Sequence, residues 1–167
     1  MEKTTQLLVN EHKRILAVAE KIEEECVKIK KGKNVDDEFF RKVIEFVRNY
    51  ADKFHHAKEE DILFKELCKN EEKMHCNPVE QMLYEHNLGR DFIKGIEEGM
   101  KKRDRKMIVD NALGYVNLIR EHIFKEDNIL YPIAEETLSK KTQIEMLKKF
   151  EKIEKSNSQL EKYKSIL

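Results

Sequence analysis

The chain has 167 residues, of which 40% are charged, and it contains only five glycines and two prolines. This length is sufficient for one domain with its own hydrophobic core, and we expect a single domain over residues 1–167. The 33 basic and 33 acidic residues leave no net charge, which argues against a nucleic-acid or membrane-surface partner. No apolar stretch approaches the roughly 20 residues of a membrane span.

The cysteines indicate a reducing environment. Cys26, Cys68 and Cys76 are odd in number and form no CxxC pair. The N-terminus carries no apolar signal segment. We therefore expect a reduced, cytoplasmic protein.

The scarcity of glycine and proline predicts an all-α fold, and the first helix is expected at about residues 4–31. Apolar residues recur through it at helical spacing. His12 lies within this apolar stripe and is therefore predicted to point into the core. After a break, Asp36 or Asp37 is suited to cap the next helix.

The second predicted helix covers about residues 38–69. His55 and Glu59 are four residues apart on its inward stripe, so both side chains lie on one face of the helix. His56 is turned away from this stripe and has polar neighbours one turn away on either side. We therefore expect His56 to be exposed, or to contact a metal ligand rather than bind metal. His55→Ala should cost metal, whereas His56→Ala should largely retain it.

The third predicted helix starts at Asn77-Pro78, a favourable N-terminal pair, and runs to about Lys101. His86 lies on its inner stripe. Gly89 follows one turn later and would allow another backbone or an exogenous ligand to approach closely, although a packing role fits equally well.

The fourth predicted helix follows a cap at Asp104 and extends to about Thr137. It again carries a histidine and a glutamate four residues apart, His122 and Glu126, on the buried side. Pro132 should kink or loosen its last turns. A fifth, amphipathic helix over about residues 139–165 is rich in lysine, and it would either pack along the bundle or serve a partner.

The second and fourth helices share the motif His-x-x-x-Glu-x-x-Ile-Leu-aromatic, once from His55 to Phe64 and once from His122 to Tyr131. Each motif follows a helix with one inward histidine, so the chain contains two similar helical hairpins. This repeat predicts an up-down-up-down four-helix bundle over about residues 4–137, with an additional C-terminal helix.

The repeat also predicts how the ligands are arranged. Counted from the end where the first and third helices start, His12 and His86 lie roughly 9 Å below His55 and His122. Glu59 and Glu126 lie one turn nearer to the lower pair. The two carboxylates would then bridge between histidines above and below them.

This combination of side chains favours a metal site. A single inward histidine is usually an ordinary core residue, but here four successive helices each carry one. Two buried carboxylates also need cations, and the only basic residues on those stripes are Arg48 and Arg90. Such nitrogen and oxygen donors suit iron or manganese, and zinc would accept them too. Four residues next to the ligands are candidates for orienting the imidazoles: Tyr84, Glu85, Tyr115 and Glu121.

Taken together, these motif pieces resemble the hemerythrin-like family, which contains the HHE cation-binding domain. The resemblance extends over about residues 7–136, and residues 150–154 are similar to the family's usual tail helix. It implies a four-helix bundle around a non-haem di-iron centre with two iron ions. The implied terminal ligands are His12, His55, His86 and His122, and the implied bridging carboxylates are Glu59 and Glu126.

The sequence departs from the oxygen-carrying members of the family, which have a fifth histidine on the third helix and an aspartate on the fourth. Here Arg90 occupies the position four residues after His86, and the fourth helix provides Glu126. The ligand set is more similar to bacterial di-iron proteins linked to nitric oxide stress and iron-sulfur repair, and to some iron or oxygen sensors. Reversible oxygen carriage is therefore in doubt.

These observations predict a di-iron binding protein that takes up a small diatomic ligand, oxygen or nitric oxide, for sensing, storage or stress defence. Two alternatives remain. One is a di-iron oxidoreductase that consumes peroxide or nitric oxide. The other is a metal-stabilised interaction module that uses the fifth helix, with a protein partner that the sequence does not identify.

Overall fold

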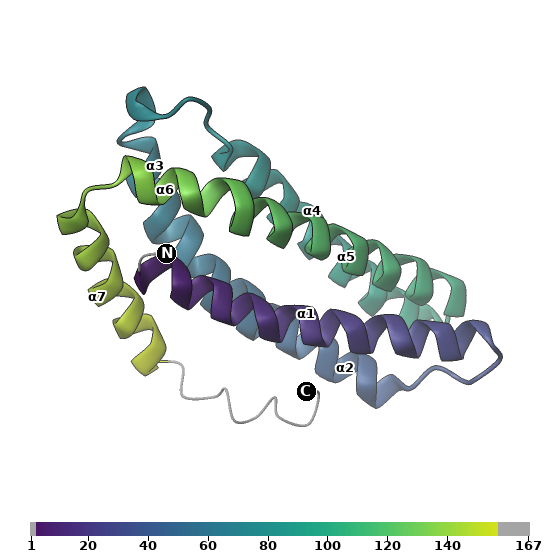
Figure 1. Ribbon diagram of the computed structural model, residues 1–167. Coiled ribbons are helices and arrows are strands. Elements are labelled where there is room, and N and C mark those ends of the chain that lie inside the picture. The colour runs from purple at the N-terminus through teal and green to yellow at the C-terminus, as the bar shows by residue number, and fades with distance from the viewer. Residues whose placement is uncertain (1–2, 157–167) are drawn as a thin grey trace.

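The computed structural model of the protein describes residues 3–156, and within that range the chain is helical with no strand. The helices run alternately up and down in a four-helix bundle with one further helix after it, which confirms the predicted fold class (Figure 1). In chain order the elements are α1 (Lys3–Lys30), α2 (Asp37–Phe46), η1 (Val47–His56), η2 (Glu59–Leu63), α3 (Phe64–Cys68), η3 (Glu71–Lys73), α4 (Val79–Lys102), α5 (Arg105–Lys125), η4 (Glu126–Leu130), α6 (Tyr131–Thr137) and α7 (Lys140–Ser156).

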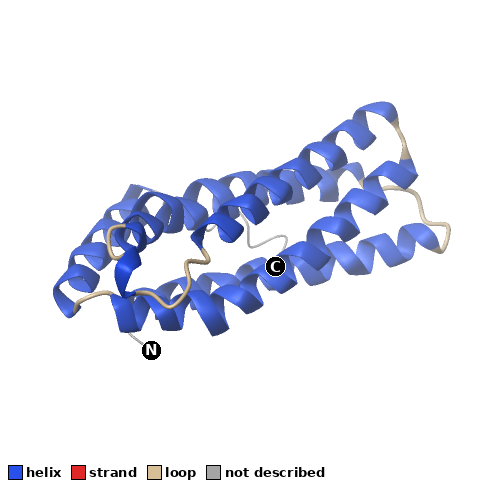
Figure 2. Cartoon of the chain, turned by 90° about the horizontal axis from the view of Figure 1, so that it is seen from above, coloured by secondary structure: helices blue, strands red, loops and turns tan. Residues whose placement is uncertain are grey.

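Several of these elements join end to end into longer helical segments, so each half of the bundle consists of two long segments. The elements from α2 to α3 form one continuous helical segment, residues 37–68, and those from α5 to α6 form another, residues 105–137. Loops lie at the ends of the bundle (Figure 2). Asp36 and Asp104 cap the two long segments by accepting hydrogen bonds from the amides of Phe39 (3.0 Å) and Met107 (2.9 Å).

The second and fourth helical segments widen into π-helical turns where they carry the repeated motif. Backbone amides in these turns bond to the carbonyl five residues earlier, as between Ala57 and Asp52 and between Tyr131 and Glu126. Pro132 does not break the fourth segment, because it occupies the first turn of α6, directly after the wide turn of η4. The extra residue per wide turn changes which side chains face inward.

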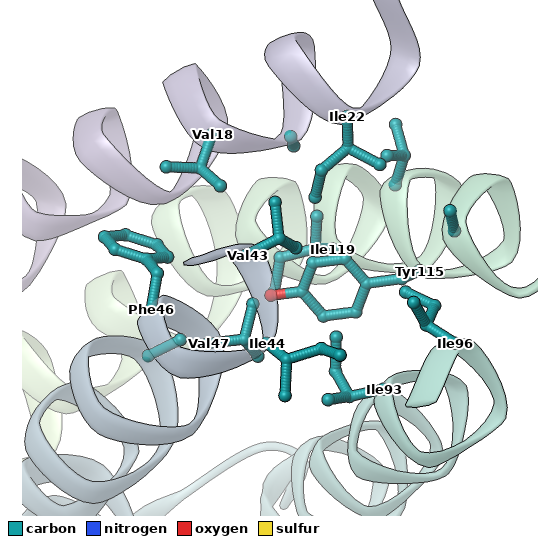
Figure 3. Close-up of a cluster of buried hydrophobic side chains, with 14 of the residues drawn as sticks. Val18, Ile22, Val43, Ile44, Phe46, Val47, Ile93, Ile96, Tyr115 and Ile119 are labelled. Carbon is teal, nitrogen blue, oxygen red and sulfur yellow. The ribbon is translucent and has the colours of Figure 1, made fainter. Parts of the chain in front are cut away.

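The core is divided into two hydrophobic clusters along the bundle axis. The larger cluster lies towards the α1–α2 loop and contains residues such as Ile22, Val43 and Tyr115 (Figure 3). The smaller cluster lies towards the opposite end and contains Leu8 and Leu130. On every helix of the bundle the predicted metal ligands fall between members of the two clusters, so the polar site is closed off at both ends.

The fifth helix, α7, lies at the end of the bundle where α1 starts and where α3 and α6 finish (Figure 1). Met146 and Phe150 bury its apolar face in the smaller cluster. It begins at Lys140, as predicted, and the expected continuation from residue 157 to 165 lies outside the described residues. None of the described helices combines the length and apolar character that a membrane span requires.

Candidate metal centre

The histidines of each hairpin lie at one level of the bundle. His12 is 18 residues before the end of α1 at Lys30, and His55 is 18 residues after the start of α2 at Asp37. At 1.5 Å per residue, both lie roughly 27 Å from the loop that joins these helices. The predicted offset of roughly 9 Å is therefore wrong. The prediction counted residues from the opposite end of the bundle. There the two segments are unequal in length, because α1 starts nine residues before His12 whereas the second segment continues 13 residues beyond His55.

As a result, the imidazoles meet in pairs across the bundle interior. The Nε2 atoms of His12 and His55 are 3.0 Å apart, and those of His86 and His122 are also 3.0 Å apart. Glu126 lies between the pairs, with Oε2 3.1 Å from His12 Nε2 and Oε1 3.1 Å from His122 Nε2. The structure thus brings together all six predicted ligands: His12, His55, Glu59, His86, His122 and Glu126.

Every one of these four imidazoles is held from behind by a carboxylate that accepts a hydrogen bond from Nδ1. The donor–acceptor distances are 2.7 to 2.8 Å, and the arrangement follows the internal repeat. A proton on Nδ1 leaves the Nε2 lone pair free to face the interior. The pairs are His12 with Asp127, His55 with Glu11, His86 with Glu60, and His122 with Glu85.

Two lysines pair with two of the four outer carboxylates. Lys58 is fully buried, donates a hydrogen bond to Glu11 and lies 3.3 Å from Glu154 of α7. The corresponding Lys125 donates to Glu85 but is half-buried, because α7 covers only the first half of the centre. These lysines lie behind the imidazoles and so do not balance the charge at the middle of the site.

The middle of the site contains carboxylate oxygens that lack hydrogen-bond donors. Among the described residues, Glu59 Oε2 and both oxygens of Glu126 are buried without a hydrogen-bond partner. They lie near Nε2 atoms, but a nitrogen whose ring carries its proton on Nδ1 cannot donate from Nε2. Unpaired buried oxygens opposite nitrogen lone pairs are unfavourable unless protons or a metal cation lie between them.

Without metal, protons occupy this space. Burial and the charge of Glu126 raise the pKa of Glu59 to about 8. Burial lowers the pKa of His12 and His122, but their bonds to Asp127, Glu85 and Glu126 outweigh it and raise these values to about 9 and about 10. Metal ligands must be deprotonated, so metal binding near neutral pH displaces these protons, and metal affinity rises with pH.

His56 also lies at the site. The expectation that its side chain is exposed is wrong, whereas the alternative expectation, that it contacts a predicted metal ligand, agrees with the structure. It is 7% exposed, and its ring stacks on His86 with centroids 3.7 Å apart. Ring nitrogens of His56, His86 and His122 lie within 4.8 Å of one another. The helical period of 100° per residue placed His56 outside, whereas the π-helical turn of η1 brings two consecutive histidines inward.

Tyr131 completes the other half of the centre. Its hydroxyl group donates a 2.6 Å hydrogen bond to Glu59 and lies 3.2 Å from His12 Nε2. Phe64, at the corresponding position of the repeat, stacks on His86 and has no hydroxyl group. The two halves therefore differ: the first has a tyrosine as its additional polar group, and the second has His56.

Comparison with known families agrees with this geometry. The family model described as the hemerythrin HHE cation-binding domain matches residues 3–134. The chain belongs to this family. Comparisons with curated proteins and with solved structures give no significant match.

The donor set of this hemerythrin-like domain fits metal binding. His12, His55, Glu59 and Glu126 each offer a ligand atom, and these four atoms lie within 4.8 Å of one another. Imidazole nitrogens with carboxylate oxygens are typical ligands for iron, manganese and zinc. A cation at this position would satisfy the unpaired oxygens and the nitrogen lone pairs together.

The sequence identified only one of the four residues that orient the imidazoles of this hemerythrin-like domain. Of the four suggested orienting groups, Glu85 holds an imidazole, Tyr84 and Glu121 are exposed, and Tyr115 is buried in the core. Glu11, Glu60 and Asp127 were not proposed for that role. The signal for them was the repeat, since each of these carboxylates stands directly beside a predicted ligand.

Proposed function

We propose that this hemerythrin-like domain binds two iron ions and takes up a neutral diatomic ligand, dioxygen or nitric oxide. The observation that carries the proposal is the pairing of the four imidazoles, each with Nδ1 tied to a carboxylate and Nε2 turned inward. A satisfied core histidine needs no second histidine 3.0 Å away. Two metal ions explain both pairs at once.

We assign one iron to each half of the centre. His12 and His55 would hold the first ion, with Tyr131 beside it. His86 and His122 would hold the second ion, with His56 as a third imidazole. The buried carboxylates Glu59 and Glu126 lie between the two halves and would be shared by both ions.

The remaining residues of the site keep these groups in place. The outer carboxylates fix the imidazole tautomers and orientations, which increases the basicity of the ligating nitrogens. Lys58 and Lys125 donate hydrogen bonds to two of those carboxylates, Glu11 and Glu85. The hydrophobic clusters on both sides exclude bulk water from the centre. Iron bound there would supply reversible redox chemistry and a position for a small ligand.

The cavity beside the centre, with a volume of about 20 Å³, fits a ligand of only a few atoms. Sensing, storage or stress defence would each use such binding. The predicted cytoplasmic location is part of this proposal, and a metal-stabilised interaction module that uses α7 is kept as one alternative. An oxidoreductase that consumes peroxide or nitric oxide is the other alternative.

The two functions differ in stoichiometry. We expect the reduced, iron-loaded protein to bind nitric oxide or dioxygen at no more than one or two molecules per chain, with an absorption change that is complete at that stoichiometry. The zinc-loaded protein serves as the control and should show no such change. Continued consumption of nitric oxide or peroxide over many equivalents, absent with zinc, would contradict a binding function and support the oxidoreductase.

A further inference from the structure

A small cavity lies against the second half of the centre and not between the two halves. Its volume is about 20 Å³, which is enough for roughly one water-sized molecule. Three imidazoles, those of His56, His86 and His122, form part of its wall. The rest of the lining comprises apolar residues, among them Gly89, Leu118 and Ile119, and the charged residues Asp52, Glu85 and Arg90.

Gly89 creates this space. It is one turn after His86 and is buried, and a Cβ atom there would meet only Leu118 at 3.7 Å and Tyr115 at 3.8 Å. Both are ordinary contact distances, so close packing of helices does not require glycine at this position. In the first half of the repeat the corresponding residue, three after His12, is Ile15, which is 1% exposed. At this position of the repeat, the first half therefore has a large apolar side chain and the second half has no side chain.

The cavity is also close to solvent. An outer groove of about 200 Å³ shares Val47, Asp52 and Arg90 with it, so these three residues form the wall between them. Arg90 donates hydrogen bonds to Asp52 at 2.9 Å and to Glu60 at 2.7 Å, and its side chain is 31% exposed. Movement of the Arg90 side chain would break these charge-assisted hydrogen bonds and would open a short route inward for a small molecule.

We propose that the diatomic ligand binds in the cavity at Gly89, on the His86 side of the centre, and that the absent side chain at this position is what admits it. This inference rests on the proposed function and specifies its binding place. In the other half, the position that corresponds to Gly89 is filled by the buried side chain of Ile15.

The lining of the cavity indicates the chemical class of the ligand. Apolar side chains and the carboxylates of Asp52 and Glu85 line the cavity and disfavour an anion, which would lose its hydration there. The N–H groups of Arg90 are already bonded to Asp52, Asn87 and Glu60. Dioxygen and nitric oxide are neutral and of suitable size. Small anions such as azide are expected to bind less readily than these gases.

Filling the cavity tests the proposal. We expect Gly89→Ile to lower nitric oxide affinity of the reduced, iron-loaded protein at least tenfold while two irons per chain are retained. Gly89→Ala, whose Cβ fits without strain, should cause a smaller loss of about two- to threefold. The matched control is Asp91→Ile, which places the same side chain on the exposed face of α4 and should bind like the native protein.

Unchanged affinity in Gly89→Ile with iron retained would overturn the proposal and leave the proposed function standing. Nuclear magnetic resonance of the native protein in diamagnetic, zinc-loaded or metal-free form gives a second test that does not depend on iron or on a variant that folds. Dissolved dioxygen, which is paramagnetic, should broaden the methyl signals of Leu118 and Ile119 more than those of Ile15. Equal broadening would overturn the proposal, even if the native protein bound no iron.

Discussion

Replacing Glu126 by glutamine is expected to reduce the metal content from two ions per chain to less than one. Glu126 is fully buried and contacts imidazoles of both halves, at 3.1 Å from His12 and from His122. An amide of the same size cannot share its charge between two cations, and its NH₂ group cannot coordinate. Loss of partners that only orient a ligand costs about 10- to 100-fold in metal affinity, so loss of this carboxylate should cost more.

The control for this prediction is Glu121→Gln, the same chemical change at an exposed position five residues earlier on the same helix. Elemental analysis after growth with iron should find native metal content in the control. Circular dichroism of both variants shows whether the fold persists. If Glu126→Gln keeps two tightly bound ions, Glu126 is not a bridging ligand and the proposed centre is incorrect.

Replacing His56 by alanine is expected to remove one ion of the two. The sequence predicted that His56→Ala would largely retain metal, but the structure buries this ring against His86 and places it within 4.8 Å of His86 and His122 nitrogens. His55→Ala should instead affect the ion of the first half. We therefore expect both variants to hold about one ion per chain, measured by elemental analysis.

A surface histidine provides the comparison. His75 lies in the exposed loop before α4, so His75→Ala should retain native metal content. The two site variants should also differ from each other in the absorption spectrum, because different halves would lose their ion. Native metal content in His56→Ala would show that His56 only packs against His86 and that the second ion is held by two imidazoles.

The helices were predictable because their signals are local. Capping aspartates, apolar periodicity and scarce glycine placed every helix boundary of the bundle within about two residues of its observed position. The meeting of the six proposed ligands was predictable because of the repeat. An inward histidine is ambiguous alone, but four of them with two glutamates at matching positions specify a site.

The side of η1 on which His56 lies could not be predicted from α-helical periodicity. That periodicity assumes 100° per residue, and a π-helical turn alters this locally. The repeat was misleading as well, since the residue corresponding to His56 is Ile123. The sequence was thus least informative at positions that differ between the two repeats. At these same positions the two halves of the centre differ in chemistry.

The buried lysine illustrates a second limit. Lys58 is adjacent to a predicted ligand and reads as a solvent-facing residue of a charged helix, yet it is fully buried. Its ammonium group lies 3.8 Å from the ring of Phe54 and reaches Glu154 on α7. The packing of α7 over this half of the bundle, a contact between segments far apart in the chain, contributes to its burial together with Phe54 and Glu11.

The most direct test of a di-iron centre is the metal content of the native protein after expression with iron, together with its absorption spectrum before and after exposure to air. We predict two irons per chain and near-ultraviolet charge-transfer bands that change with oxygen. Absence of metal, or zinc alone with a featureless spectrum, would contradict the di-iron centre while leaving the helical bundle intact.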